Sequence, residues 1–223
     1  MKTQINLKNS ILYVIGLLFI SLGVALSFRH GFGASSADNL TYILSVVLNI
    51  SIGTSNFILS ALIIALLILS FKNWKFLFLF VQVIILSPLI DFWDLIVFAN
   101  LFPVGFERVI VFIASLLSLP LGCAFLIKST YPAGVYDELM FFTAHFTKFK
   151  LTVSRMLNEL LLVLIALTIS LLTDNGYGSV SIGTLAYVFS VGYLIKFYLS
   201  SWEFISKRRN KNASKSNDRS HLS

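Results

Sequence analysis

The chain has 223 residues, of which 57% are hydrophobic and 12% are charged, and its mean hydropathy is +0.87. Soluble domains average roughly 45–50% apolar and about 25% charged residues, so the composition excludes a water-soluble globular domain. The net charge of +7 could suggest a nucleic-acid partner, but six of the 17 Lys and Arg residues lie in the tail after the last apolar run. That placement indicates that the basic residues set the orientation of the chain in the membrane and do not form a nucleic-acid-binding surface.

Six apolar runs are long enough to cross a membrane, since a crossing helix needs roughly 20 apolar residues. In chain order they cover residues 11–28, 54–71, 76–98, 109–127, 151–173 and 180–204. The first run follows Lys2 and Lys8 and is longer than the apolar region of a signal peptide, so we expect an uncleaved signal-anchor helix. Two shorter segments, 36–50 and 135–146, contain charged residues and predict helices that do not span.

The lysine distribution favours six crossings. If the short segments do not cross, the lysines at 72–75, 128 and 148–150 share one side with both termini, and only Arg29 and Arg108 face the other side. The positive-inside rule then puts both termini in the cytoplasm. The sequence therefore predicts an all-α integral membrane protein with six transmembrane helices and two short non-spanning helices.

An internal repeat appears when the chain is moved along itself by 99 residues. This offset pairs Leu22-Gly23 with Leu121-Gly122, Ala34 with Ala133, and Asp38 with Asp137 without a gap. One membrane domain, residues 1–205, would then contain two repeats, about 10–102 and 106–205, ahead of a basic tail, 206–223, whose polar composition predicts disorder. Three crossings per repeat is an odd number, so the second repeat would be inverted relative to the first, as in many secondary transporters.

An ordered set of short motifs runs from about Gly16 to Tyr198. It consists of Leu22-Gly23-Val24-Ala25-Leu26, Gly31-Phe32-Gly33 with Asp38, Ile52-Gly53-Thr54, Leu121-Gly122 with Ala133-Gly134 and Asp137, Arg155 with Glu159, and Ser181-Ile182-Gly183-Thr184-Leu185. In this order the motifs resemble the YczE/YyaS/YitT family of small bacterial membrane proteins. The resemblance implies a multi-pass protein of the bacterial plasma membrane with no established activity.

The chain departs from the family pattern at two places. The turn before the first aspartate is usually rich in Gly and Pro, whereas here it reads Gly33-Ala34-Ser35-Ser36-Ala37. A Gly-Gly pair is expected where this chain has Asp174-Asn175-Gly176-Tyr177-Gly178. The resemblance therefore supports a location and a topology, and it names no reaction.

Asp38 and Asp137 are the first candidates for a polar or ion site, because each opens a short helix and the repeat makes them equivalent. Charged groups at membrane depth are costly, and they often mark substrate or ion paths. The structural alternative is capping, since an aspartate in the first turn complements the helix dipole and Ser35 with Asp38 fits a capping box.

A second group of candidates follows Pro88, which interrupts the third apolar run. Asp91 and Asp94 are spaced i, i+3, so in an α-helix they would share one face and could meet Arg108 at the start of the next span. The alternative places both aspartates at the outer headgroup boundary.

Arg155 and Glu159 are spaced i, i+4 near the start of the fifth run, where they can neutralise each other as a structural lock or as part of a gate. Asn158 could extend this network to another helix. His30, His145 and His221 show no metal-ligand spacing and are expected to be solvated. We expect no metal, no cofactor and no enzymatic activity, because no arrangement typical of nucleophilic or acid–base catalysis is present.

Two functions fit these features. A small transporter or permease-like protein for an unknown solute or ion comes first, since an inverted repeat with short helices opening on acidic residues can build a site near the membrane midplane. The alternative is a non-transporting accessory or regulatory protein that binds another membrane protein through helix faces rich in small residues. In both cases the lipid bilayer is the surrounding partner.

Overall fold

The computed structural model describes residues 7–129, 131 and 134–220, with side chains up to residue 204, and every regular element in this part of the chain is helical. The α-helices are α1 (Leu7–Ser27), α2 (Ser36–Leu48), α3 (Ile52–Phe71), α4 (Leu79–Asp91), α5 (Phe106–Ser129), α6 (Val135–Thr147), α7 (Leu151–Leu172) and α8 (Ile182–Ser220). A 3₁₀ helix, η1 (Trp74–Phe78), precedes α4, and a π-helix, η2 (Phe92–Val97), follows it.

Six helical segments are long and apolar enough to cross a membrane: α1, α3, the continuous η1–α4–η2 segment, α5, α7 and residues 182–204 of α8. Each predicted span is confirmed as a helix. By contrast, α2 and α6 have 13 residues each, about 20 Å at roughly 1.5 Å per residue, which is shorter than the hydrocarbon core of about 30 Å. The helix α8 continues to Ser220, through residues for which the sequence predicts an irregular tail.

The two short helices begin and end by similar local chemistry. Ser35 and Gly134 hold the extended N-cap conformation, and Asn49 and Lys148 follow the helices in the left-handed conformation, with φ of 54° and 61°. A left-handed residue cannot continue a right-handed helix. Both helices therefore stop after 13 residues.

Helices α1 and α5 cross in antiparallel directions with their backbones in contact. A Cβ atom on Gly16 would lie 2.9 Å from the carbonyl oxygen of Gly122, and one on Gly23 would lie 2.7 Å from the backbone nitrogen of Leu119. Side chains cannot fit at these points. The small residues of α1 and α5 are therefore used inside the molecule.

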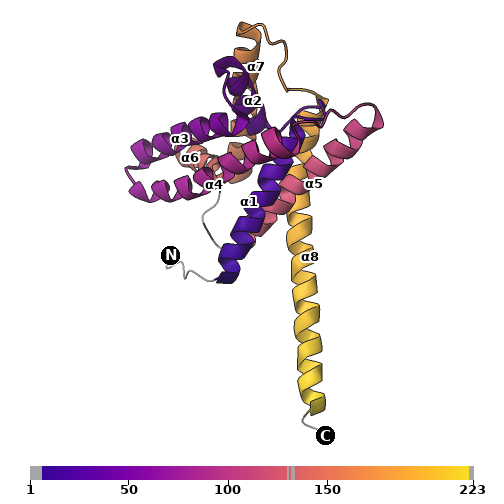
Figure 1. The fold of residues 1–223 in the computed structure, drawn as a ribbon. Coiled ribbons are helices and arrows are strands. Elements are labelled where there is room, and N and C mark those ends of the chain that lie inside the picture. The colour runs from indigo at the N-terminus through magenta and orange to yellow at the C-terminus, as the bar shows by residue number, and fades with distance from the viewer. Residues whose placement is uncertain (1–6, 130, 132–133, 221–223) are drawn as a thin grey trace.

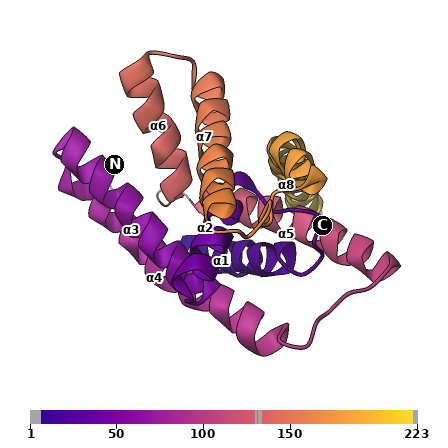
Figure 2. The same cartoon turned by 90° about the horizontal axis from the view of Figure 1, so that it is seen from above.

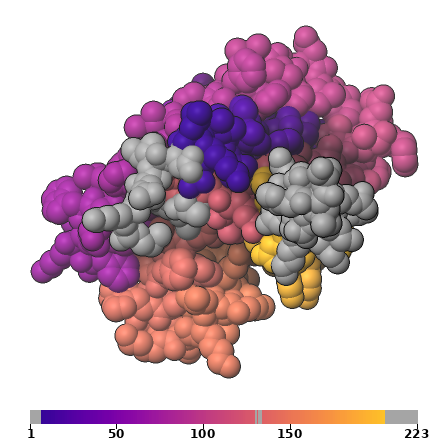
Figure 3. Space-filling model, turned by 90° about the horizontal axis from the view of Figure 1, so that it is seen from below, coloured from indigo at the N-terminus to yellow at the C-terminus, as the bar shows by residue number. Residues whose placement is uncertain are grey.

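The remaining helices are arranged around this crossing as hairpins (Figures 1 and 2). Helix α3 packs against α4, and α6 packs against α7, while α4 lies on α1 and α8 lies on α5. Seen from below, α3 (purple) and α6–α7 (orange) form separate lobes of the surface (Figure 3). Helix α2 contacts α3 and α7, and α3 contacts α6, so the short helices connect the two hairpins.

Candidate functional site

A cavity of about 570 Å³ lies at the centre of the protein, between the starts of the two short helices. All eight α-helices contribute to its wall, which is apolar over most of its area. Its polar lining residues are Ser35, Ser36, Asp38, Asn56, Ser60, Gln82, Tyr131, Tyr136, Asp137, Arg155, Glu159 and Tyr187. The cavity thus brings together Asp38, Asp137, Arg155 and Glu159, four of the seven charged residues that the sequence singles out.

Asp38 lies in the first turn of α2, where it is 9% exposed. The hydroxyl of Ser35 donates to Asp38 Oδ2 at 2.6 Å and accepts the backbone N–H of Asp38 at 3.4 Å. The predicted capping contact is therefore present. Burial raises the pKa of Asp38 to about 6, although the hydrogen bond from Ser35 acts in the opposite direction. Among the described residues, Asp38 has no ion-pair partner.

Asp137 occupies the equivalent place in α6 but is exposed. Its Oδ2 atom accepts the backbone N–H of Gly134 at 3.3 Å, which is also a capping contact. The two aspartates thus differ in their access to solvent, with Asp38 enclosed and Asp137 reachable. Both remain on the cavity wall.

Arg155 and Glu159 form the predicted pair on α7, with 3.1 Å between Nε and Oε1. The pair is partly exposed, at 44% and 25% of the two side chains, so its net contribution to stability is small. Asn158 makes a contact with another helix, because its Oδ1 atom accepts the hydroxyl of Thr143 on α6 at 2.6 Å, while its Nδ2 atom has no hydrogen-bond partner among the described residues.

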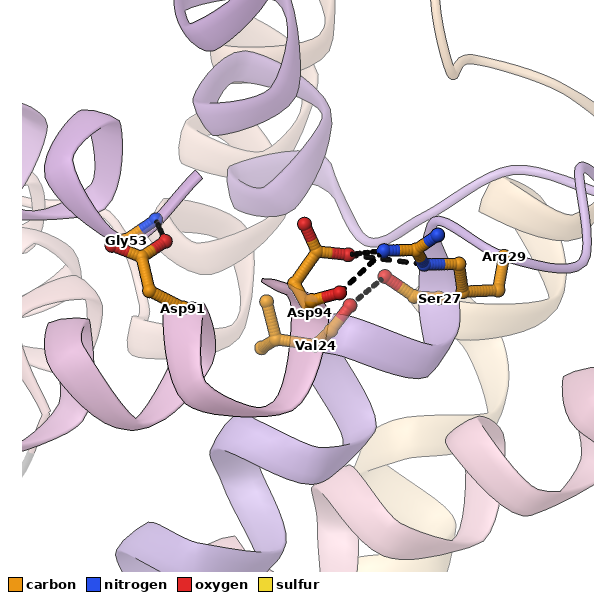
Figure 4. Close-up of polar contacts among 6 residues, drawn as sticks. All are labelled: Val24, Ser27, Arg29, Gly53, Asp91 and Asp94. Atoms are coloured by element: carbon orange, nitrogen blue, oxygen red, sulfur yellow. Dashed lines mark hydrogen bonds and ion pairs between the residues drawn. The ribbon is translucent and has the colours of Figure 1, made fainter. Parts of the chain in front are cut away.

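The predicted meeting of Asp91 and Asp94 with Arg108 is wrong (Figure 4). Asp91 caps α3, accepting the Gly53 N–H and the Ser51 hydroxyl, each at 2.6 Å. Asp94 accepts Arg29 Nε at 3.0 Å. The reason lies in η2, where the amide of Phe98 bonds five residues back to Trp93. This wider turn rotates Asp94 away from the face of Asp91.

Arg108 instead reaches the loop after α1. Its Nε atom donates to the carbonyl oxygen of His30 at 2.7 Å, and its guanidinium lies 4.8 Å from the centre of the Phe32 ring. This is a cation–π contact in a partly enclosed place. Arg108 therefore stabilises the loop and does not face the cavity.

His30, which the sequence predicts to be solvated, is fully buried. Its Nδ1 atom accepts the backbone N–H of Phe32 at 3.0 Å, and its Nε2 atom lies 3.4 Å from the hydroxyl of Tyr187, which in turn contacts Ser115. Burial, and then the nearby Arg108 charge, lower the pKa of His30 to about 4, so the ring is neutral. His145 is exposed as predicted, and His221 lies outside the described residues.

Residues 32–39, which include the cavity residues Ser35 and Asp38, are in contact with residues 179–184. The Gly183 N–H donates to the carbonyl of Phe32 at 2.7 Å, and the Ser179 hydroxyl donates to Oδ1 of Asn39 at 2.5 Å. A Cβ atom on Gly183 would lie 2.3 Å from the Phe32 oxygen. Two of the glycine motifs that carry the family resemblance thus meet here, beside the enclosed Asp38.

Gln82 is a site residue that sequence reasoning missed. It is 6% exposed and lines the cavity, and its Oε1 atom has no hydrogen-bond partner. Such an orphaned buried acceptor costs free energy unless another molecule satisfies it. The available signal was its position as the single amide between residues 76 and 98.

A groove of about 600 Å³ between α3 and α4 is a weaker candidate. It is lined by apolar side chains of these helices together with Asp91, and both oxygens of that carboxylate are already used at the start of α3. Among the described residues, no three of His, Cys, Asp or Glu lie close enough to hold a metal ion. The central cavity is therefore the candidate site.

Comparison with known proteins places the chain among proteins without an assigned activity. A sequence model described as "Family of unknown function (DUF6198)" matches residues 7–200. The "Uncharacterized protein YyaS" of Bacillus subtilis (strain 168) is 25% identical over 200 residues, which cover 88% of this chain and 96% of that protein. No solved structure matches.

Proposed function

The chain belongs to DUF6198, a family of unknown function, and from its own residues we propose that it is a small carrier that holds a solute in the central cavity during passage across the membrane. The observation that carries this proposal is the convergence of Asp38, Asp137, Arg155 and Glu159 on one cavity. Charged groups are costly at membrane depth and are found there chiefly where they line a path or a site. Six apolar helices provide the surrounding membrane domain.

An inverted repeat is part of the proposal, and three features support it. The starts of α2 and α6 are 99 residues apart, as are their ends and the starts of α3 and α7. The offset relates α1–α4 of the first half to α5–α8 of the second. In this correspondence, the contact between α1 and α4 matches the contact between α5 and α8, and the contact between α2 and α7 matches the contact between α6 and α3. The antiparallel crossing of α1 and α5 is the relation that inversion of the second half requires.

The setting of the carrier is proposed from the charge pattern and the family resemblance. We place it in the bacterial plasma membrane with both termini in the cytoplasm, because the loop lysines then lie inside. In that orientation, the exposed Asp137 faces the cytoplasmic side and the enclosed Asp38 faces outward. In this proposal the cavity opens to the cytoplasm near Asp137, and the contact between residues 32–39 and 179–184 lies on its outer side.

The alternative is an accessory protein that binds a membrane partner, with no enzymatic activity in either case. Its working surface would be the faces rich in small residues on α1. Gly16 and Gly23 on that helix, however, lie against α5 with no room for a side chain. This packing favours the carrier.

The test compares metabolite pools in cells that produce the natural chain or a variant with Asp38→Asn and Asp137→Asn. A carrier should change the cellular and extracellular pools of at least one solute, and the double variant should lose that change while its membrane insertion is retained. The matched control is Asp174→Asn, an exposed loop aspartate away from the cavity with a left-handed backbone that asparagine adopts readily.

The outcomes separate the carrier from the two alternatives. Asparagine caps a helix about as well as aspartate, so a purely structural role for both residues would leave the pools as in the natural chain. Unchanged pools together with altered co-purification of a membrane protein would indicate the accessory function. The first result would refute the two aspartates as the binding site, and the second would refute the carrier.

A further inference from the structure

Resting on the proposed carrier function, we infer that the cavity accepts an organic cation: an ammonium, amidinium or guanidinium head on an apolar body. Four charged side chains line the cavity, three carboxylates and one guanidinium. The guanidinium, that of Arg155, is already paired with Glu159. Asp38 and Asp137 are thus the charges left for a ligand, and both are negative.

The starts of α2 and α6 do not reverse this preference. A helix N-terminus carries about half a positive charge and attracts anions, and two such ends face the cavity. Each end, however, is already met by the carboxylate of its own aspartate, through Ser35 in α2 and through the amide of Gly134 in α6. An anionic ligand would find the dipoles compensated and two carboxylates in its way.

An independent observation points to a hydrogen-bond donor on the ligand. Gln82 Oε1 is an acceptor without a partner on a side chain that is 94% removed from solvent, and it belongs to the cavity wall. The side-chain amide of Gln82 lies next to the start of α6, since a Cβ atom on Gly134 would be 3.6 Å from its Nε2 atom. A cationic head group bound by Asp137 could therefore donate a hydrogen bond to Gln82 Oε1, which has no other partner among the described residues.

The body of the ligand follows from the rest of the wall. Leucine, isoleucine and valine side chains of α1, α4, α5 and α8 form most of it, and Tyr131, Tyr136 and Tyr187 add ring faces. Aromatic rings and carboxylates together are the usual surroundings of organic ammonium groups. A bare metal ion is a poorer match, because no three of the described carboxylate, imidazole or thiol groups converge.

Cys123 provides the measurement, since it is the only cysteine of the chain and lines the cavity. Purified protein in nanodiscs is alkylated with N-ethylmaleimide in the presence of benzamidinium or of benzoate, which has nearly the same shape and the opposite charge. We expect the cation to slow alkylation and the anion to have no effect. Thermal unfolding with the same two probes gives a second readout, in which the cation alone should raise the midpoint.

The variant Asp38→Asn should raise the half-protecting concentration of the cation at least about tenfold, because an ion pair in an enclosed, low-dielectric place is worth more than a factor of ten. Asp137→Asn should raise it by a smaller factor, because Asp137 is exposed and its charge is screened by solvent. Asp38→Glu and Asp137→Glu keep the negative charge, so their half-protecting concentrations should stay close to that of the natural chain. These variants distinguish a loss of charge from a loss of folding. Asp174→Asn should bind like the natural chain.

Three results would overturn the inference: no protection and no thermal shift with the cation, equal effects of both probes, or cation binding that the asparagine variants leave unchanged. These results concern charge preference alone. The carrier function fails separately, through unchanged metabolite pools, so a neutral or anionic solute would leave the carrier in place while refuting the cation.

Discussion

Arg29 and Asp94 illustrate how the protein handles charge at the ends of its spans. Their side chains are 17% and 10% exposed, and the guanidinium also donates to the backbone carbonyl of Asp94. Removing one partner of such a pair leaves the other charge buried and uncompensated. The Lys128–Glu203 pair, at 28% and 63% exposed, is of the ordinary surface kind.

We therefore predict that Asp94→Asn lowers the free energy of unfolding by roughly 3 kcal/mol, measured as a loss of thermal stability in detergent. Glu203→Gln is the matched control, and it should cost less than about 1 kcal/mol because its charge is mostly solvated. Adding Arg29→Gln to Asp94→Asn removes the orphaned charge and should recover most of the loss. An equal loss in the double variant would show that the pair is not the cause.

Asp38 gives the site a pH dependence. Because its pKa is raised to about 6, its carboxyl gains a proton as the pH falls through 6, and affinity for a cation should fall with it. Tyr136, Tyr187 and Cys123 border the same cavity and keep their protons at this pH. Asp137, Glu159 and Arg155 are the other ionisable groups on the wall.

The measurement is the shift of the thermal midpoint with benzamidinium concentration between pH 5 and pH 8. The natural chain should bind more weakly below pH 6, and Asp38→Asn should bind weakly and show no transition near pH 6. A transition that persists in Asp38→Asn would assign it to another group.

At the scale of the element, the close contact of α3 with α4 depends on Gly53. A Cβ atom there would lie 2.1 Å from the carbonyl oxygen of Ser87 and 2.6 Å from Cγ of Asp91. Gly53→Ala should therefore force the helices apart and cost about 1–3 kcal/mol as overpacking does. The readout is the thermal midpoint of the purified protein.

Gly192 is the natural control for this substitution. It lies within α8, and a Cβ atom there would meet nothing within 4 Å. Gly192→Ala should leave the midpoint unchanged or raise it slightly, since alanine favours a helix by about 0.5–1 kcal/mol over glycine. Equal losses in the two variants would contradict the role of close packing at Gly53.

The elements that the sequence predicts well are those fixed by local chemistry. Run length and hydropathy predict the six long helices, and the capping residues predict where α2 and α6 begin. The π turn of η2 has no such local signal, because Pro88 lies inside α4 without ending it, and residues 92–97 contain neither Gly nor Pro. That single turn decides which partner Asp94 meets, so the predicted contact with Arg108 failed.

At the scale of the whole molecule, the two halves are packed unequally. Helix α4 lies against both α1 and α3, whereas α8 lies against α5 and has at most slight contact with α7 in the described residues. The sequence could place Asp38 and Asp137 as a pair, because the 99-residue offset relates them. It could not show that one would be enclosed and the other exposed, since that difference arises from contacts between distant segments such as 32–39 and 179–184.

The predicted orientation is tested by single cysteines in a Cys123→Ser background. Asn73→Cys, in the turn between α3 and α4, should react with an impermeant maleimide only after the cells are permeabilised. Asn175→Cys, in the loop before α8, should react in intact cells, because an odd number of spans separates the two positions. Labelling of residue 73 from outside would refute the orientation with both termini in the cytoplasm.

The crossing of α1 and α5 has a consequence for how the protein is made. The groove on α1 at Gly16 and Gly23 is complementary to the backbone of α5. Because α5 lies far along the chain from α1, the first helix enters the bilayer long before this partner is synthesised. With roughly a hundred residues between them and synthesis at about 5–20 residues per second, α1 waits on the order of ten seconds with this groove facing lipid or the insertion machinery. The fold is thus completed by late assembly within the membrane, and a chain truncated before α5 leaves the ribosome with its central contact unmade.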